Sequence, residues 1–315
     1  MFALFNCVRH HAKTHKKSIR KAYKVLGGVA GIGAVIFVLT LIHNELSSIS
    51  RGVSSTSTFT RRATDIPSGE PLFDLPRPKK GPVPYGKAIF QCAKQGQIAL
   101  AFDDGPSDWT EQIVDLLDAH GFKATFFMTG DSPLLQHRRI DDPASPYPDL
   151  LRRMHMAGHQ LASHTWTHAH LDRIGRDDVA REMVYNEMAF RNALGLVPTY
   201  MRPPYGVWRD EAVNGQLAEL GYHVVMYNID TKDYLHNDRD GIQESVDIFN
   251  DAVQPHANGS YIVLAHDVRE WTALKLVPAM VKTILVRGYE AVTIGECLDD
   301  EDWTNWYRDP EVESP

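Results

Sequence analysis

The sequence predicts an α/β protein whose parallel strands form a barrel. From Lys87 onward, short apolar runs alternate with helix-like segments seven times, which is typical of a parallel β/α architecture. Several of the helix-like segments are followed by the Gly that commonly ends a helix. No Gly-rich phosphate-binding loop follows the first apolar run, and this favours a barrel over a dinucleotide-binding sheet.

The N-terminal 42 residues predict a membrane anchor. Residues 1–24 contain seven Lys or Arg and no acid, and residues 25–42 are 18 consecutive residues without a charge. A span of about 20 apolar residues crosses a bilayer. The run is longer than the apolar region of most cleaved signal peptides, so an uncleaved signal-anchor is favoured. The basic segment 1–24 is expected in the cytosol, which places the rest in the lumen or outside the cell.

The next segment, 43–86, is expected to be a flexible stem. Its first part is rich in Ser and Thr, and six prolines follow between positions 67 and 84. Such composition is typical of linkers that do not pack. The pair Arg61-Arg62 is either a processing site that would release a secreted domain or two solvated charges. The packed domain is predicted at 87–298, and 299–315 is expected to be an acidic tail.

Charge argues against a nucleic-acid partner. The whole chain carries −7, and removing the seven positive charges of residues 1–24 leaves −14 for the remainder. Nucleic acids require a basic face. The charge does not argue against a neutral substrate.

Polar clusters follow five of the predicted strands. The apolar runs are 98–102, 124–128, 160–163, 199–201, 223–229, 261–265 and 291–294, and the helix-like segments between them are 110–120, 147–158, 177–194, 209–221, 241–255 and 271–288. Active sites of parallel barrels form at the carboxyl ends of strands. The clusters expected to meet at one rim are Asp103-Asp104, His164-Thr-Trp-Thr-His168, Arg202-Pro-Pro-Tyr205, Asp230-Thr-Lys-Asp233-Tyr234 and His266-Asp267.

One cluster has the spacing of metal ligands. Two His at i and i+4 can bind one metal ion, and one carboxylate completes a set that leaves a position open for water. Thr165 follows the first His, which excludes the zincin motif, and residues 103–115 lack the pattern of a calcium loop. Each cluster by itself is most simply explained as a turn or as polar residues on the surface. Together they favour a mononuclear transition-metal site.

These clusters resemble the five ordered motifs of the polysaccharide deacetylase family, which is carbohydrate esterase family 4 with the NodB-homology domain. Residues 149–154 and 159–168 are most similar to fungal chitin deacetylases, and the resemblance covers about residues 88–298. It implies a distorted (β/α)7-type barrel and a metal-dependent hydrolase that removes N-acetyl groups from chitin or chito-oligomers, giving chitosan and acetate. The alternatives are a same-family esterase on O-acetylated xylan and a carbohydrate-binding barrel without catalysis.

The resemblance also implies roles for individual residues. The metal is usually zinc, with cobalt or another divalent transition metal as the alternative, and its ligands would be Asp104, His164 and His168. Asp103 would be the general base, oriented by Arg202, and His266 the general acid, oriented by Asp233. The backbone N–H of Tyr205 would face the oxyanion, and Leu264 and Tyr234 would line the acetyl pocket. The sequence departs from the family pattern at Ala101, usually Thr, and at Tyr234, more commonly Trp.

The residues support this chemistry independently. An amide needs a strong nucleophile and charge stabilisation, which a metal supplies, and its amine leaves poorly unless an acid protonates it. A His beside a carboxylate is such an acid near neutral pH. The aromatic residues Trp166, Tyr205 and Trp208 are candidates either to stack on sugar rings or to pack inside the domain.

Two covalent features are expected on the extracytoplasmic side. Cys92 precedes the first apolar run and Cys297 follows the last, so a disulfide between them would close the barrel; two free buried thiols are the alternative. The single Asn-x-Ser/Thr sequon, Asn258-Gly-Ser260, predicts a glycosylation site in a turn.

Overall fold

The computed structural model describes residues 66–135 and 137–311. The predicted cytosolic segment 1–24, the predicted signal-anchor 25–42 and most of the predicted stem lie outside these residues. Of the helices in the described ranges, none is both long and apolar enough to span a membrane.

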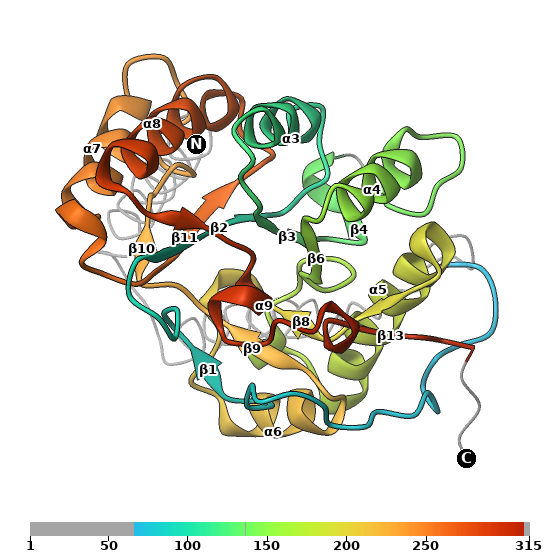
Figure 1. Ribbon diagram of the computed structural model, residues 1–315. Helices are drawn as coiled ribbons and strands as arrows, with labels where there is room; N and C mark the ends of the chain where they lie inside the picture. Colours follow the sequence, from blue (N-terminus) through green and yellow to red (C-terminus); the bar gives the residue numbers. More distant parts are fainter. Residues whose placement is uncertain (1–65, 136, 312–315) are drawn as a thin grey trace, which may run out of the picture. The chain divides into compact units, whose positions relative to one another are not determined.

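One curled, all-parallel sheet organises the described residues (Figure 1). Its strand order is β1-β9-β8-β6-β3-β2-β11-β10, and β12 pairs with β2. Within the described ranges the outer strands β1 and β10 do not pair with each other, so the sheet is an open half-barrel. The strands are β1 (Ala88–Ile89), β2 (Gln97–Asp103), β3 (Thr125–Met128), β6 (Gln160–Ser163), β8 (Tyr200–Met201), β9 (His223–Val225), β10 (Ile229–Asp230), β11 (Tyr261–His266) and β12 (Glu290–Ala291).

The α/β class and the parallel sheet are confirmed, with several changes in the strands. β1 was not predicted, and the predicted strand 291–294 contributes only Ala291 to β12, because Ile294 already begins a short helix. The run 223–229, predicted to be one strand, is two strands that pair with different neighbours. β9 pairs with β8 and β1, whereas β10 pairs with β11. The sheet therefore opens in the middle of this run, and its two ends belong to the two edges of the half-barrel.

Helices follow the strands and cover the outside of the sheet (Figure 1). They are α3 (Thr110–Ala119), α4 (Tyr147–Met156), α5 (Arg176–Leu194), α6 (Glu211–Glu219), α7 (Ile242–Ala252), α8 (Val277–Arg287) and the short α9 (Ile294–Cys297). A π-helical turn, Thr272–Leu276, leads into α8. Two small antiparallel pairs join β4 (Asp131–Ser132) to β5 (Arg138–Arg139) and β7 (Val197–Pro198) to β13 (Tyr307–Arg308).

The strand β2 shows why its sequence is apolar throughout. Side chains alternate between the two faces of a strand, and both faces of a parallel sheet are buried. Ile98, Leu100 and Phe102 pack in one core cluster with residues of α3, α4, α7 and α8. Ala99 and Ala101 pack in a second cluster with Phe127 and Tyr200 from β3 and β8. The small alanines leave room for these large rings.

The predicted stem is wrong for residues 66–86, which pack against the domain. Leu72 is buried with Val184 and Met188 of α5. Arg77 donates from Nη1 and Nη2 to the two carboxylate oxygens of Glu187, at 2.6 and 2.8 Å. Glu187 lies on the buried face of α5 and needs a cation there, because an unpaired buried carboxylate is costly. That cation comes from a residue 110 positions earlier in the chain.

The predicted acidic tail is also wrong for residues 299–311. Asp300 is buried and accepts hydrogen bonds from the Tyr200 hydroxyl, at 2.8 Å, and from the Asn305 amide, at 2.7 Å. Trp306 is buried, and β13 extends the fold by pairing with β7. The domain therefore spans at least residues 66–311, and its first and last described segments run close to each other (Figure 1).

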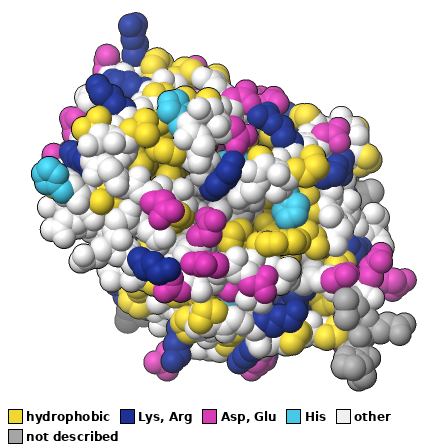
Figure 2. Space-filling view, in the orientation of Figure 1, with side chains coloured by type: hydrophobic (Ala, Val, Ile, Leu, Met, Phe, Trp, Pro, Cys, Tyr) yellow, Lys and Arg dark blue, Asp and Glu magenta, His cyan; other side chains and the backbone are white. Residues whose placement is uncertain are grey.

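Cys92 and Cys297 form a disulfide that joins residues 205 positions apart. Both sulfurs are buried, and the Ala93 N–H donates to the Cys297 carbonyl at 2.8 Å. The disulfide ties the approach to β2 to α9. Over the face shown in Figure 2, Lys and Arg side chains lie scattered among Asp and Glu side chains.

Candidate active site

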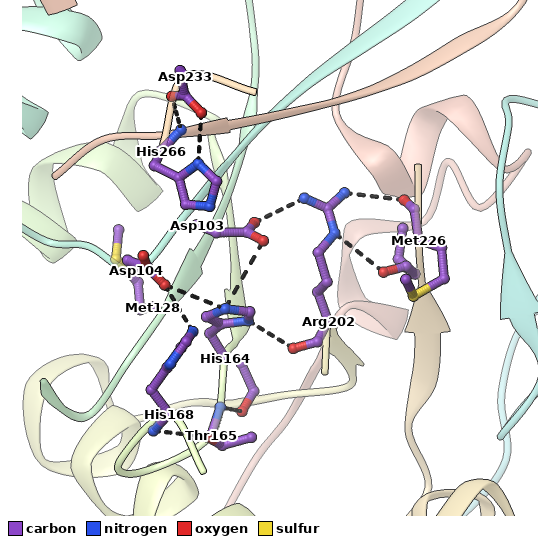
Figure 3. Close-up of polar contacts among 12 residues, drawn as sticks. Asp103, Asp104, Met128, His164, Thr165, His168, Arg202, Met226, Asp233 and His266 are labelled. Atoms are coloured by element: carbon purple, nitrogen blue, oxygen red, sulfur yellow. Dashed lines mark hydrogen bonds and ion pairs between the residues drawn. The ribbon is translucent and has the colours of Figure 1, made fainter. Parts of the chain in front are cut away.

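The five polar clusters lie at the carboxyl ends of neighbouring strands. Asp103 ends β2 and His266 ends β11, and the two residues pair in register. His164 follows β6, Arg202 follows β8, and Asp233 lies just beyond β10. Figure 3 shows these side chains directed toward one another. Because the parallel strands place their carboxyl ends at one edge of the sheet, residues up to 163 positions apart in the chain come together there.

Asp103 and Arg202 form a buried ion pair. Arg202 Nη1 donates to Asp103 Oδ1 at 2.8 Å, and both side chains are almost fully buried. The guanidinium is itself fixed, because Nε donates to the Val225 carbonyl and Nη2 to the Met226 carbonyl at 3.2 and 3.0 Å (Figure 3). It also lies over the Phe127 ring, 4.4 Å from the centroid. Arg202 therefore holds one oxygen of Asp103 and leaves Oδ2 facing the other residues.

Asp104, His164 and His168 have the geometry of a metal-ligand set. One ligand atom from each lies within 4.8 Å of the other two. Asp104 Oδ1 is 3.4 Å from His164 Nε2 and 3.1 Å from His168 Nε2, and this buried oxygen has no hydrogen-bond partner. His164 Nδ1 donates to the Arg202 carbonyl at 2.7 Å, which leaves Nε2 with its lone pair toward Asp104. One oxygen and two ring nitrogens that can each offer a lone pair to a metal thus converge on one point, as a divalent cation requires.

The electrostatics of Asp104 also suit a cation. Burial by itself would raise the pKa of this carboxyl group, but His164, His168 and His266 outweigh burial and lower the pKa well below its usual range. Asp104 is therefore ionised at neutral pH.

The loop that carries His164 and His168 is held in place by hydrogen bonds to helix α5. Glu182 accepts hydrogen bonds from the Thr167 N–H and hydroxyl, both at 2.7 Å. The His168 N–H donates to Thr165 Oγ1 at 3.1 Å. Thr165 and His168 have positive φ, 68° and 59°, a conformation that non-glycine residues adopt only when surrounding contacts fix it.

His266 and Asp233 form a second, largely buried pair of charged groups. His266 Nδ1 lies 2.7 Å from Asp233 Oδ1, and Asp233 Oδ2 accepts from the His266 N–H and the Thr272 hydroxyl at the same distance. Burial lowers the pKa of His266, but the Asp233 carboxylate outweighs it and, with Asp104 and Asp103, raises the pKa to about 9. The imidazole is therefore protonated at neutral pH, with its far edge toward Asp103 (Figure 3).

Comparison with known proteins agrees with this arrangement. Residues 90–225 match the family described as polysaccharide deacetylase. A chitin deacetylase of Colletotrichum lindemuthianum is 39% identical over 227 residues, which are 72% of this chain and 88% of that protein. The chain belongs to the polysaccharide deacetylase family. The solved structure of the chitin deacetylase from the same fungus covers 73% of this chain and 99% of its own, with a TM-score of 0.68.

Other members of the polysaccharide deacetylase family are more distant or longer. A chitin deacetylase of Arthroderma benhamiae is 40% identical over 73% of this chain, which spans 59% of that protein. The peptidoglycan N-acetylglucosamine deacetylase PgdA of Listeria monocytogenes is 35% identical over 65% of this chain and 39% of its own length.

Of the three predicted substrate-binding residues, Tyr205 lies beside His168 and Tyr234 lies beside His266. Leu264 lies on β11 and is only 6% exposed, whereas Tyr234 is 40% and Tyr205 is 60% exposed. The Tyr234 ring lies edge-on to His266, 5.4 Å between centroids, and its hydroxyl donates to Asp230 Oδ2 at 3.1 Å. Tyr205 stacks on His170 with centroids 3.5 Å apart.

Of the three aromatic candidates, Trp166 packs inside the domain, because its side chain is completely buried. Trp208 packs edge-on against Phe90 and under Arg209. Tyr205 alone of the three presents most of its surface to solvent. The predicted glycosylation site, Asn258, is exposed in the turn before β11.

Sequence reasoning missed the residues that support the site from neighbouring elements. Glu182 and Thr272 make the contacts described above, and His170 stacks on Tyr205. Asp267 belonged to a predicted cluster but had no predicted role, and it lies buried beside His266. Glu182 had one available signal, because it lies with Asn186, at i and i+4, on a face of α5 that is mostly apolar. Thr272 and His170 carry no such pattern.

Proposed function

We propose that this protein is a metal-dependent deacetylase that hydrolyses N-acetyl groups of N-acetylglucosamine units in chitin or chito-oligomers. The products would be acetate and a free amine, which makes the polymer chitosan. The observation that carries this proposal is the joint presence, at one rim, of a fixed carboxylate, a three-atom metal-ligand set and a protonated His. The 39% identity to a chitin deacetylase supports the choice of polymer.

The residues present fit a divalent transition metal, and we propose zinc. Two imidazole nitrogens and one carboxylate oxygen are its preferred ligands, and Asp104, His164 and His168 would hold it. When bound, the metal would acidify water and polarise the acetyl carbonyl oxygen. The buried Asp104 oxygen that accepts no hydrogen bond would then gain a partner.

Asp103 is suited to take the proton from the attacking water. Arg202 fixes its Oδ1 and keeps the carboxylate from rotating, so Oδ2 stays directed toward the metal ligands, 3.9 Å from His164 Nε2. Water oxygen bonds to the acetyl carbon as its proton passes to Asp103. The neighbouring Asp104 would hold the cation, so the two acids would have different tasks.

His266 is suited to protonate the leaving nitrogen. As the carbon–nitrogen bond breaks, the electron pair stays on nitrogen, and a proton from His266 turns it into a neutral amine. Asp233 keeps the imidazole charged until that moment. Donation from the Tyr205 N–H to the developing oxyanion would add about 3 kcal/mol of stabilisation, and Leu264 and Tyr234 would contact the acetyl methyl.

The test is acetate release by the purified protein from chitin oligomers, acetylxylan and peptidoglycan, compared at equal concentrations of acetyl groups. We expect release from chitin oligomers that chelation abolishes, that zinc restores and that Asp103→Asn removes. Preference for acetylxylan would favour the esterase. A protein that binds zinc but releases no acetate from any of the three would be a carbohydrate-binding barrel, and the proposal would be rejected.

The role of His266 can be tested by comparing the hydrolysis of an amide with that of an ester. An alkoxide leaves more readily than an amine, so an ester depends less on the acid. We expect His266→Ala to reduce acetate release from chitin oligomers more than from an aryl acetate. Equal losses on both substrates would contradict the role of His266 as the acid.

We further propose that the catalytic domain works outside the cytosol, anchored through residues 25–42 or released from the anchor. The charge pattern of residues 1–42 supports this location, as does the disulfide between Cys92 and Cys297. Protease protection of the full chain in isolated membranes tests it. A C-terminal domain that is digested without detergent would contradict a lumenal location.

A further inference from the structure

Asp267 is a buried acid that the mechanism above does not use. It follows His266 directly, and its side chain is completely buried. Oδ2 accepts a hydrogen bond from the Thr110 hydroxyl at 2.6 Å, while Oδ1 has no hydrogen-bond partner. Among the described residues, no Lys, Arg or His forms an ion pair with the Asp267 carboxylate. Such a group is expensive to bury in its charged form.

Asp267 is linked to the turn that follows the two catalytic acids. Ser107 donates from its hydroxyl to the Asp267 carbonyl at 2.6 Å. Thr110 Oγ1 accepts a hydrogen bond from the Ser107 N–H at 2.8 Å, and the same hydroxyl donates a hydrogen bond to Asp267. The end of β11 and the start of α3 are thus joined by a closed set of buried hydrogen bonds.

The carboxyl group also lies directly against Gly105, the residue after the metal ligand Asp104. A Cβ at position 105 would lie 2.0 Å from Asp267 Oδ2 and 2.4 Å from Oδ1, closer than any side chain tolerates. The Gly105 carbonyl is held on its other side by the Thr129 N–H at 3.0 Å. Asp104 itself has φ of 77°, so its backbone needs support from its neighbours.

We propose that Asp267 is a positioning residue whose carboxyl group supports the Gly105 backbone and so fixes Asp103 and Asp104 relative to His266. This inference rests on the proposed function for its effect on turnover, but its effect on metal binding is independent of the substrate. The turn requires the shape and the hydrogen bond of the carboxyl group, not its charge. Burial is consistent with this, because it raises the pKa of Asp267 to about 7. Asp104 and Asp103 add to that rise, and the Thr110 hydrogen bond and the charge of His266 oppose it.

The first test compares Asp267→Asn with Asp267→Ala. Asn keeps the shape and the acceptor for Thr110, so we expect kcat and zinc affinity within about threefold of wild type. Ala removes the support, so we expect zinc affinity to fall about tenfold and kcat to fall about thirtyfold, with KM little changed. Zinc affinity is measured on the metal-free protein by competition with a chromophoric chelator, after circular dichroism shows that each variant is folded.

The second test uses Gly105→Ala, alone and combined with Asp267→Ala. Gly105 does not have a positive φ, so this substitution probes the contact with Asp267 and not the backbone conformation. We expect Gly105→Ala to weaken zinc binding at least tenfold in the wild type and less than threefold in the Asp267→Ala background, where the added methyl has room.

Three results would overturn the proposal. They are an Asn variant as impaired as the Ala variant, an Ala variant with wild-type zinc affinity and kcat, and losses from Gly105→Ala and Asp267→Ala that simply multiply. If the wild-type protein releases no acetate from any substrate, the proposed function fails, while the zinc affinities of these variants still decide the role of Asp267.

Discussion

The two ends of the same parallel strands are built by different means. At the carboxyl ends, polar side chains from single short motifs converge on the predicted metal and acid sites. At the amino ends, segments that are distant in sequence bind the fold together. There Arg77 reaches the Leu220 carbonyl before β9, the Tyr307 hydroxyl accepts from the start of β6, and Cys92 and Cys297 join beside β11.

Backbone conformation shows the same difference. Nine non-glycine residues in the described ranges have positive φ, and five of them lie at the carboxyl ends of the strands: Asp104, Thr165, His168, Tyr205 and Lys232. Each such residue costs about 1 kcal/mol or more, which surrounding contacts must offset. Most of the strained backbone thus lies at the carboxyl ends of the strands, around the candidate site, whereas the amino ends contribute packing. We expect substitutions at the first end to remove activity, and substitutions at the second to remove stability.

The largest effect on activity is expected from Asp103→Asn. An amide cannot take a proton from water, and general-base catalysis contributes about 10²- to 10⁴-fold, so we expect kcat to fall about a thousandfold. The stability and the zinc affinity should change little, because Arg202 can still donate to the Asn oxygen and Asp104 remains. Acetate release, chemical denaturation and zinc competition measure the three quantities. A large loss of stability would contradict the division between the two ends.

The complementary change is Glu187→Ala at the other end. It leaves Arg77 buried without its anion and the Tyr222 hydroxyl without its acceptor, and breaking a buried pair costs about 3–5 kcal/mol. We expect urea denaturation to show a loss of that size, with kcat per folded molecule unchanged. Lys94→Ala is the matched control, because it removes an exposed pair with Asp299 and should leave the urea midpoint unchanged. A fall in kcat of the folded Glu187→Ala protein would break the comparison.

Glu182→Gln sharpens the comparison, because Glu182 supports the carboxyl end from inside the packed domain. Gln keeps one acceptor for the Thr167 loop but loses the charge and the second strong acceptor, and substitutions beneath metal ligands commonly cost about 10- to 100-fold in metal affinity. We expect about a tenfold loss of zinc affinity by chelator competition. Asp178→Asn, on the exposed side of the same helix, should have no effect.

The difference between the two ends of the strands also explains which features could be predicted from the sequence. The residues of the carboxyl end were predictable because Asp103-Asp104, His164 to His168 and His266 each follow an apolar strand, and parallel strands bring such ends together. The packing of residues 66–86 and 299–311 was not predictable from composition. A Pro-rich segment and an acidic segment are typical of chain that does not pack. Only the folded structure shows that Arg77 pairs with Glu187 and that Asp300 accepts a hydrogen bond from Tyr200. The split of 223–229 into two strands depended likewise on which neighbours each half pairs with.

The smallest expected effect is a shift in pH dependence from Asp233→Asn. The pKa of His266 is about 9 because the Asp233 carboxylate outweighs burial, which acts in the opposite direction. His266 must be protonated to act as the acid, so kcat should fall as pH rises through its pKa. Without the carboxylate the pKa falls, and we expect the alkaline limb of the kcat profile to move about one to two units toward lower pH.

Thr272→Val is the matched control for this shift. It removes one hydrogen bond to Asp233 Oδ2 but keeps the charge that raises the pKa of His266. Its alkaline limb should therefore move less than that of Asp233→Asn. If both variants lose kcat equally at every pH with no movement of the limb, Asp233 only orients the ring. The carboxyl end would then depend, at this position, on packing as much as the amino end does.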